Sequence, residues 1–328
     1  MRPGLIHLLG IALVLQLASL ARAAAPTTQP SPTAVITLNG EIDNYARDIL
    51  FRHFAEAKAM GAKTVILELD TPGGLVTSAL NIAQFLRAQD DLYIIAYVHH
   101  EAYSGGSMVA LACNEIDMEP GAALGDCAPI IFSPAGVQSM GETERAKEES
   151  PVLSDFYASA QRNGYDPLLV STMVHLHHDV YWVQSPDGKR KFVEEAEHKE
   201  LLGKGWKDVP GVPVPVNRGT LLTVDAKLAH TLGLSKGTYE TVQDLAKAKS
   251  LNILATLELT GGEEFVGWLG SAVVRAALIF VLLQALYIVF SHPGHGLAEA
   301  VAAIALAVLL VVPMMTGYAS WGDITLIL

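Results

Sequence analysis

One serine stands where a nucleophile would be useful. Ser104 follows an apolar segment that is typical of a buried strand, and it precedes Gly105-Gly106, where a helix is expected to begin. The amides at a helix N-terminus favour negative charge, and glycines beside a serine let a substrate carbonyl approach closely. The pattern indicates a serine nucleophile, with an ordinary helix N-cap at Ser104 or Ser107 as the alternative.

A glycine pair offers the complementary half of the same chemistry. The segment DTPGG at 70–74 directly follows the apolar run 64–69, so Gly73 and Gly74 lie at the end of an expected strand. Adjacent glycines can turn their backbone N–H groups toward a ligand, and such amides stabilise the oxyanion of an acyl-transfer intermediate. Gly73 and Gly74 are therefore the predicted oxyanion hole, unless the segment is only a tight turn.

A serine nucleophile needs a base, and the residues alone leave the choice open. Lys147 lies in the Glu-rich segment 142–149, which otherwise resembles a solvated helix face. A lysine serves as a base only where burial lowers its pKa enough to leave it neutral. The histidine candidates are His99, His100, His175, His177 and His178.

The cluster HLHHD at 175–179 also raises the question of a metal site. Histidines at relative positions i, i+2 and i+3 of an expected helix do not converge on one ion. We therefore expect solvated or structural histidines there, and neither a metal nor a cofactor.

The elements that must position these residues alternate along the chain. Expected strands cover 34–38, 64–69, 92–98 and 115–118, and helical patterns cover 43–60 and 78–86 and begin again at 106. Such alternation predicts an α/β fold with a mostly parallel sheet. The carboxyl ends of parallel strands are where sites form, and both Gly73-Gly74 and Ser104 stand there.

The N-terminus has the order of a secretory signal peptide. Arg2 precedes an apolar run over 5–20, and Ala21-Arg22-Ala23 supplies small residues for cleavage before Ala24. Residues 1–23 are therefore the predicted signal peptide, with an uncleaved anchor as the alternative. Residues 24–32 are rich in Pro, Thr and Ser, which predicts a flexible spacer.

The C-terminal region, 265–328, reads as a membrane module. Apolar runs cover 265–290 and 297–315, each long enough to cross a bilayer as a helix, and HPGHG at 292–296 predicts the turn between them. Arg275 is expected near a membrane interface because a charge at mid-membrane is costly. Residues 324–328 resemble the start of a third span, cut short.

Composition limits the remaining possibilities. The 328 residues carry a net charge of −12, which argues against a nucleic-acid partner. Apolar residues make up 51% of the chain, in keeping with membrane segments. Cys113 and Cys127 are the two cysteines, which is too few for a disulfide framework. We expect two unpaired buried thiols rather than a bridge.

Taken together, these segments resemble the long form of the NfeD family, the stomatin-operon membrane proteases related to ClpP. The resemblance covers most of residues 34–328. It is carried by LELDTPGGL (67–75), AYSGGSMVAL (102–111), IDMEPGAALGDCAPI (116–130), GTLLTVDAKLAHTLGLSKGTYETVQDL (219–245), HPGHG (292–296) and GYASW (317–321). Gly105 stands where the family usually has alanine, and Pro151 is expected to kink the helix that carries Lys147.

The resemblance implies a ClpP/crotonase-like serine protease domain over 33–250, a linker over 251–264 and the transmembrane region over 265–328. It implies a Ser104–Lys147 dyad with the Gly73 and Gly74 amides as the oxyanion hole. It further implies a stomatin-like partner or substrate, an assembly of at least two copies, and a multi-pass membrane protein whose catalytic domain lies outside the cytoplasm.

Three functions compete on this basis. The first is a serine endopeptidase that cleaves apolar segments of a membrane-associated partner in membrane protein quality control. The second is a catalytically inactive ClpP-like scaffold for membrane protein assembly. The third is a crotonase-type acyl-CoA enzyme, which fits poorly because export removes the chain from cytoplasmic CoA and because no acidic pair is evident near Gly73-Gly74.

Overall fold

The computed structural model describes residues 30–133, 136–138, 141–176, 178–292, 294 and 296–316, and for 131–138 the backbone alone. The predicted signal peptide at 1–23 and the apolar end at 324–328 lie outside the described residues. The last residues of the predicted spacer are described, and the first strand of the fold begins among them, at Ser31.

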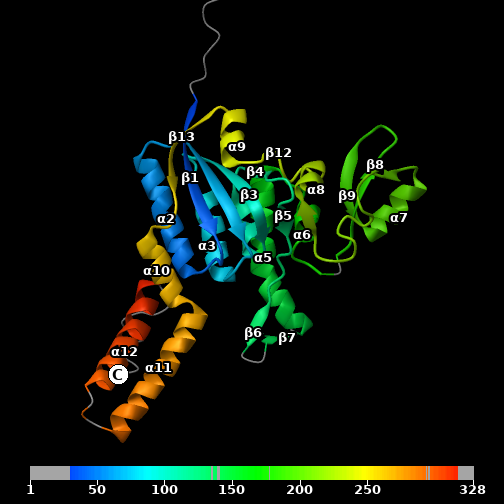
Figure 1. Cartoon of the computed structure of the whole chain (residues 1–328). Coiled ribbons are helices and arrows are strands. Elements are labelled where there is room, and N and C mark those ends of the chain that lie inside the picture. Colours follow the sequence, from blue (N-terminus) through cyan, green and yellow to red (C-terminus); the bar gives the residue numbers. More distant parts are fainter. Residues whose placement is uncertain are drawn as a thin grey trace, which may run out of the picture.

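The fold is built around one mixed, mainly parallel sheet of eight strands (Figure 1). Three long neighbours form its centre, β1 (Ser31–Asn39), β2 (Thr64–Thr71) and β3 (Tyr93–Tyr103). The short strands that complete it are β4 (Glu115–Met118), β5 (Ala123–Gly125), β11 (Thr223–Asp225), β12 (Gly237–Thr238) and β13 (Leu251–Leu257). Both β4 and β5 pair in parallel with β3, so β3 and its end lie at the centre of the sheet.

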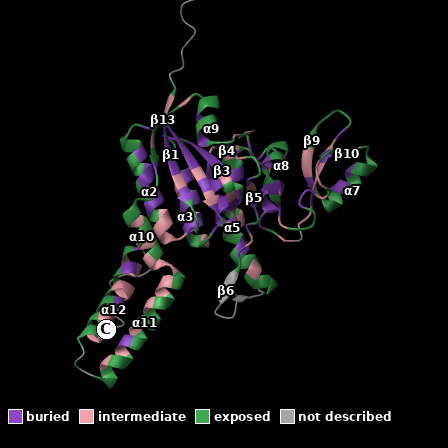
Figure 2. Ribbon diagram, in the orientation of Figure 1, coloured by how far each residue is buried: buried purple, intermediate pink, exposed green. Residues whose placement is uncertain are grey.

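Helices cover both faces of this sheet, and the strand pattern explains which residues meet them. Alternate residues of a strand point to opposite faces. Ile94, Ala96 and Val98 of β3 belong to the larger core, while Ile95 and Tyr97 belong to the smaller one. The larger core is shared with α2 (Asn44–Ala59), α3 (Val76–Arg87), α4 (Gly105–Ala112) and α5 (Glu142–Asn163), and the smaller one with α9 (Val242–Ala248). Figure 2 shows the buried centre of the sheet between these layers.

The charged segment after residue 179 forms a small lobe beside the main sheet (Figure 1). A separate three-stranded sheet and a helix pack around Val183, Val193 and Leu201. These elements are β8 (Val180–Gln184), β9 (Arg190–Glu194), α7 (Glu195–Gly203) and β10 (Lys207–Asp208). The remaining short elements are β6 (Ile131–Ser133), β7 (Gly136–Gln138), α6 (Pro167–Ser171) and α8 (Ala226–Thr231).

The segment 251–264 differs from the linker that we expected. Residues Leu251–Leu257 form β13, which pairs in parallel with β1 and extends the main sheet by one strand. Its residues alternate between half-buried and exposed, the period of a strand with one face covered. The alternation in the sequence LNILATL is the signal for this strand, although it is weaker than the long apolar runs that follow.

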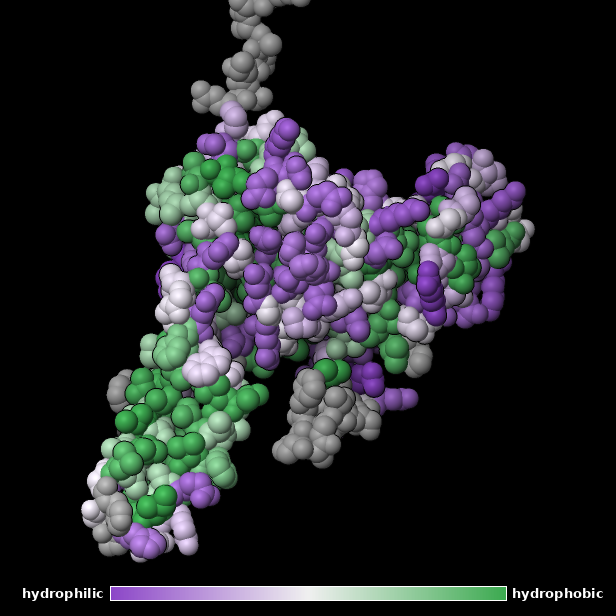
Figure 3. All heavy atoms as spheres, in the orientation of Figure 1, coloured by the Kyte–Doolittle hydropathy of each residue, from purple (hydrophilic) through white to green (hydrophobic). Residues whose placement is uncertain are grey.

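The apolar C-terminal region forms a helical hairpin that projects from the α/β domain (Figures 1 and 3). After α10 (Gly261–Gly270), α11 (Ala272–Ser291) and α12 (Leu297–Met315) are each long and apolar enough to cross a membrane, with mean hydropathies of 2.4 and 2.5. Only 6% and 22% of these stretches are buried in the protein. Exposed side chains such as Phe290 and Val273 therefore need an apolar environment that the chain itself does not supply.

The cysteines lie as the sequence predicts, and Arg275 is held at one end of the apolar hairpin. Arg275 is near the start of α11 and donates from Nη2 to the Gly270 carbonyl at 2.8 Å, close to the α/β domain. Cys113 and Cys127 are both buried and unpaired. Burial raises the pKa of both thiols, so neither has the thiolate character of a reactive cysteine.

Candidate active site

Ser104 occupies the connection between β3 and α4 in a strained backbone conformation. Its φ of 52° and ψ of −119° are rarely adopted by a residue with a side chain. The half-buried serine is held there by its own N–H, which donates to the carbonyls of Gly125 and Asp126, both at 3.1 Å. Such strain persists only where the surrounding structure fixes it, and it concentrates at functional sites.

The glycine pair lies directly against this serine. A Cβ atom on Gly73 would be 2.6 Å from the Cβ of Ser104, and one on Gly74 would be 2.3 Å from the Ile42 carbonyl oxygen. Gly73 has a φ of 101° and Gly74 a φ of 157°. Neither position has room for a side chain, so the structure requires glycine at both and brings both beside Ser104.

The backbone hydrogen bonds around the pair decide which amides face the serine. Ile42 pairs with Gly74 as an isolated parallel bridge, because the Ile42 N–H donates to Gly73 and the Leu75 N–H donates to Ile42. The N–H of Gly74 itself therefore points away from Ile42. A Cβ on Gly105 would be 3.8 Å from the Gly74 nitrogen, which places this amide beside the start of α4.

The two predicted oxyanion amides are not equivalent. The Gly73 N–H donates to the buried Thr71 hydroxyl oxygen at 3.0 Å. Within the described part of the chain, the N–H groups of Gly74 and of Gly105, the first residue of α4, have no hydrogen-bond partner. Sequence reasoning missed both Gly105 and Thr71, although the N–H of the first residue of a helix has no partner within the helix.

Ser107 does not resemble a nucleophile. Its side chain is fully buried, and its one hydroxyl proton is shared between the carbonyls of Ala102 at 2.6 Å and Gly125 at 2.9 Å, while its oxygen accepts from the Gly125 N–H at 2.8 Å. Because the Gly125 carbonyl also accepts from the Ser104 N–H, Ser107 fixes the strand end that holds Ser104.

Lys147 lies near the start of α5 with its side chain exposed. In the described residues, no hydrogen bond or ion pair connects it to Ser104 or to another group.

The C-terminal half of α5 is anchored. Arg87 contacts Asp155 at 2.5 Å and Ser159 at 2.9 Å, and Asn163 donates to the carbonyls of Leu111 and Cys113. The structure therefore brings Ser104, Gly73 and Gly74 together and leaves Lys147 apart from them. Helix α5 continues through Pro151 as one element.

The described histidine candidates all pair with carboxylates. His100 Nδ1 is 2.9 Å from Asp70, His99 Nδ1 is 2.9 Å from Glu119, and His175 Nδ1 is 2.7 Å from the buried Glu149. The hydrogen bond that the protonated ring donates to Asp70 raises the pKa of His100. His178 lies 3.8 Å from Glu194, and His177 lies outside the described residues.

The peptide unit between Asp126 and Cys127 connects Ser104 to the segment that carries His175. The Asp126 carbonyl accepts from the Ser104 N–H, and the Cys127 N–H of the same peptide donates to the Met173 carbonyl at 2.6 Å. His175, two residues after Met173, contacts Glu149, and Glu149 lies two residues after Lys147 on α5. This chain of contacts links the start of α5 to the serine loop.

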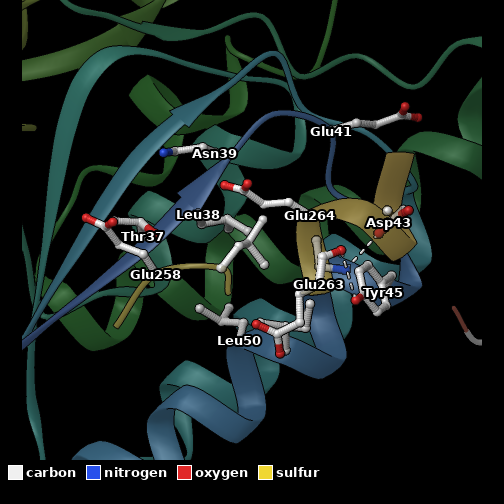
Figure 4. Close-up of a pocket in the computed structure, with 14 residues that line it drawn as sticks. Thr37, Leu38, Asn39, Glu41, Asp43, Tyr45, Leu50, Glu258, Glu263 and Glu264 are labelled. Carbon is white, nitrogen blue, oxygen red and sulfur yellow. Dashed lines mark hydrogen bonds between the residues drawn. The ribbon is translucent and has the colours of Figure 1, made fainter. Parts of the chain in front are cut away.

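A cavity lined by several carboxylates lies away from this site (Figure 4). It has a volume of about 550 Å³ and lies between the end of β1, the start of α2 and α10. Carboxylates of Glu41, Asp43, Glu258, Glu263 and Glu264 line it, and neither Ser104 nor the glycine pair does. Tyr45 donates to the Glu263 carbonyl at 3.2 Å, so this junction fastens α10 to the α/β domain.

Comparison with solved structures identifies the fold. Two mutant forms of the 1510-N membrane-bound stomatin-specific protease, a protein of Pyrococcus horikoshii, match with TM-scores of 0.51 and 0.53. The matches cover 70% and 73% of this chain and 99% and 97% of those chains. At 20% and 19% identity, they show that the α/β fold is shared.

Sequence relatives are membrane proteins. The chain is 25% identical over 294 residues to "Membrane protein NfeD1b" of Bacillus subtilis, which covers 89% of this chain and 58% of that protein. It is 34% identical over 111 residues to "Membrane-bound protease PH1510" of Pyrococcus horikoshii, which covers 33% of this chain and 25% of that one. This chain thus spans less than two thirds of the length of these relatives.

A family model, "NfeD1b, N-terminal domain", matches residues 33–201, just over half of the chain. That match includes the glycine pair, Ser104 and Lys147, and the NfeD1b relative extends the similarity across most of the sequence. The chain therefore belongs to the NfeD family, as a long form with an NfeD1b-type α/β domain and an apolar helical region after it.

Proposed function

We propose that this protein is a membrane-anchored serine endopeptidase with Ser104 as its nucleophile. The observation that carries the proposal is the strained Ser104 backbone, held directly against a glycine turn whose Gly74 amide has no partner in the described chain. A backbone that is costly to maintain, next to free amides, suits a site that must present a hydroxyl and stabilise an oxyanion.

The proposed reaction follows from these groups. The Ser104 hydroxyl gives its proton to a neutral base while its oxygen attacks the scissile carbonyl carbon. The carbonyl oxygen becomes an oxyanion that accepts from the Gly74 and Gly105 amides. Collapse of this intermediate breaks the C–N bond, and the departing amine takes the proton from the base. Water then hydrolyses the acyl-enzyme by the same steps. The Gly73 amide donates to Thr71 and is not an oxyanion donor. The role of Gly73 is to leave room for the substrate carbonyl beside Ser104.

Lys147 is the proposed base, as the family resemblance implies. An ordinary lysine, with a pKa of about 10.4, is protonated at neutral pH and cannot accept the serine proton. Lys147 is exposed in the isolated chain, so a bound peptide or a second copy must cover the start of α5 and exclude water from it. An apolar substrate segment would do so, which agrees with the proposed preference for such segments.

The proposed partner is a stomatin-like membrane protein, and the proposed role is membrane protein quality control. The 1510-N protease that shares this fold is described as stomatin-specific. The two apolar helices of this chain support a site close to a bilayer. We further propose that the chain works as at least a dimer, an inference that rests on the family resemblance alone.

The proposed topology has α11 and α12 crossing the membrane and the α/β domain on the extracytoplasmic side, as the predicted signal peptide implies. Carbonate-washed membranes should retain the protein, and protease added to spheroplasts should digest the α/β domain. Release by carbonate would contradict the membrane anchor, and full protection would contradict the orientation.

A catalytically inactive scaffold is the second candidate function. The exposed Lys147 without a contact to Ser104 favours it, because a dyad requires the two groups within hydrogen-bond reach. The scaffold would keep the fold and the membrane helices, and it would bind the same class of partner without cleaving it.

Cleavage of apolar peptides by the purified full chain in detergent distinguishes the two. We expect Ser104→Ala and Lys147→Ala each to abolish cleavage, and the double variant to be no worse than either, because the residues act as a unit. Ser150→Ala, an exposed serine on the same helix as Lys147, is the matched control. If Lys147→Ala cleaves at the parent rate while Ser104→Ala does not cleave, then His100 or His175 becomes the candidate base. The scaffold predicts no cleavage by any form.

A further inference from the structure

Two consecutive histidines of β3 lie side by side, which an ordinary strand does not allow. Neighbouring strand residues point to opposite faces, yet the ring centroids of His99 and His100 are 3.9 Å apart. The cause is an irregularity in the pairing of β2 with β3: Leu69 pairs with Val98, but Thr71 pairs with Ala102, so two residues of β2 span four of β3. Bulges of this kind re-aim side chains and concentrate near functional sites.

A carboxylate completes the cluster. Ligand atoms of His99, His100 and Glu119 all lie within 4.8 Å of one another. His99 Nδ1 and Glu119 Oε2 are 2.9 Å apart, but neither of these solvent-shielded atoms makes a hydrogen bond of acceptable geometry. The two atoms are close, but their angles do not fit a hydrogen bond. Metal ligands have the same arrangement, because their lone pairs point to a common ion and not to each other.

Asp70 supplies the support that metal-binding histidines usually have. Its Oδ2 lies 2.9 Å from His100 Nδ1, which leaves Nε2 of that ring available to a cation. A carboxylate on the outer nitrogen orients the imidazole and increases its basicity as a ligand.

We propose that His99, His100 and Glu119 form a binding site for a divalent transition-metal ion of the Zn²⁺ and Co²⁺ class. Two imidazoles and one carboxylate suit these ions rather than Mg²⁺ or Ca²⁺, which prefer oxygen ligands throughout. Three protein ligands leave a position open to water. The sequence pattern did not predict this site, since adjacent histidines on a regular strand would point apart.

The site is coupled to the serine loop by covalent connection. His100 lies four residues before Ser104 on the same segment, and Asp70 lies three residues before Gly73. The three proposed ligands lie on β3 and directly after β4, and none of them belongs to the proposed Ser104–Lys147 dyad or to the oxyanion hole. The inference therefore stands whether or not the chain is a peptidase.

Cobalt binding to the full chain tests this directly. The tag-free protein in detergent is titrated with Co²⁺, and visible absorption and calorimetry are recorded. We expect about one ion per chain with the d–d bands of a nitrogen- and oxygen-ligated site, displaced by Zn²⁺. His99→Ala and Glu119→Gln should each weaken Co²⁺ affinity at least about tenfold. His230→Ala, which removes an exposed histidine of α8, is the matched control and should bind like the parent.

His100→Asn guards against misfolding, because the His100 side chain is 65% exposed and its loss leaves the core unchanged. It too should weaken Co²⁺ binding while the circular dichroism spectrum stays that of the parent. Parent-like Co²⁺ affinity in His99→Ala, His100→Asn and Glu119→Gln would overturn the proposal. Loss of Co²⁺ binding in His175→Ala alone would also overturn it, because the ion would then belong to the His175–Glu149 pair. Absence of stoichiometric binding would show that the cluster holds only ion pairs.

Discussion

Gly73 and Ser104 are in such close contact that a Cβ atom on Gly73 would lie 2.6 Å from the Cβ of Ser104. The serine can therefore keep its strained position only while the neighbouring residue has no side chain. Gly73→Ala should displace Ser104. It should lower both turnover and the labelling of Ser104 by a fluorophosphonate, a reagent for activated serines, at least about 100-fold, since small misplacements of reacting groups have effects of that size.

Gly61→Ala separates this contact from the general cost of positive φ. Gly61 has a φ of 84°, and a Cβ there meets nothing within 4 Å. It should lose some stability and keep parent activity. Equal activity in the two folded variants would show that the contact between Gly73 and Ser104 has no functional consequence.

Ser107 should prove structural rather than catalytic. Ser107→Ala removes the buried partner of the Gly125 N–H and of the Ala102 carbonyl, which should cost about 1–3 kcal/mol in the free energy of unfolding. Because Gly125 also holds Ser104, turnover should fall, while Ser104 remains the labelled residue. Denaturant unfolding and labelling measure the two effects, and stability equal to that of Ser150→Ala would refute the role.

Arg87 should be a main anchor of the helix that carries Lys147. Its partner Asp155 is buried, with 5% of its side chain exposed, and burial raises the pKa of that carboxyl despite the arginine. Arg87→Ala leaves this charge uncompensated, so the free energy of unfolding should fall by about 3–5 kcal/mol. Arg47→Ala breaks the surface pair with Asp48 and should cost at most about 1 kcal/mol. Similar losses in the two variants would contradict the anchor.

A buried carboxylate predicts how stability changes with pH. Asp117 on β4 is fully buried, and one ammonium, Lys249, serves both Asp117 at 3.1 Å and Glu115 at 2.7 Å. Burial raises the pKa of Asp117 from 3.8 to about 6. The folded state therefore holds this proton more tightly than the unfolded chain, and its stabilising effect is lost as pH rises through that range.

Between pH 4 and pH 6, titration of this group should lower the free energy of unfolding by about 2 kcal/mol. Asp117→Asn cannot titrate, so the difference in stability between the variant and the parent should change in the same range. Thermal unfolding of both full chains in detergent at several pH values measures it. A constant difference across the range would show that Asp117 has an ordinary pKa.

The sequence predicted the fold better than it predicted the details of the site. Strand and helix periodicity located β1 to β4 and the helices between them, and apolar length located α11 and α12. The contact of Gly73 with Ser104 follows from two neighbouring strand ends, which the topology rules anticipate. Family resemblance, rather than physical pattern, selected Ser104 and Lys147.

Three features were beyond the sequence patterns that we used. The bulge that turns His99 and His100 together depends on strand register, which no local pattern specifies. The Thr71 side chain takes up the Gly73 amide, a contact that requires the folded turn. Lys147 is exposed because the buried residues of α5 begin only at Glu149. The helical periodicity of the α5 sequence predicts a helix, but it does not predict where along the helix packing against the α/β domain begins.

The most direct test of the central claim is the site of reaction with a fluorophosphonate probe. The full chain in detergent is treated with the probe, digested, and the modified residue is located by mass spectrometry. We predict one modified residue, Ser104, with labelling lost in Ser104→Ala and in Lys147→Ala and retained in Ser150→Ala. Absence of labelling in the folded parent protein, or labelling of a residue other than Ser104, would contradict the claim that Ser104 is an activated nucleophile.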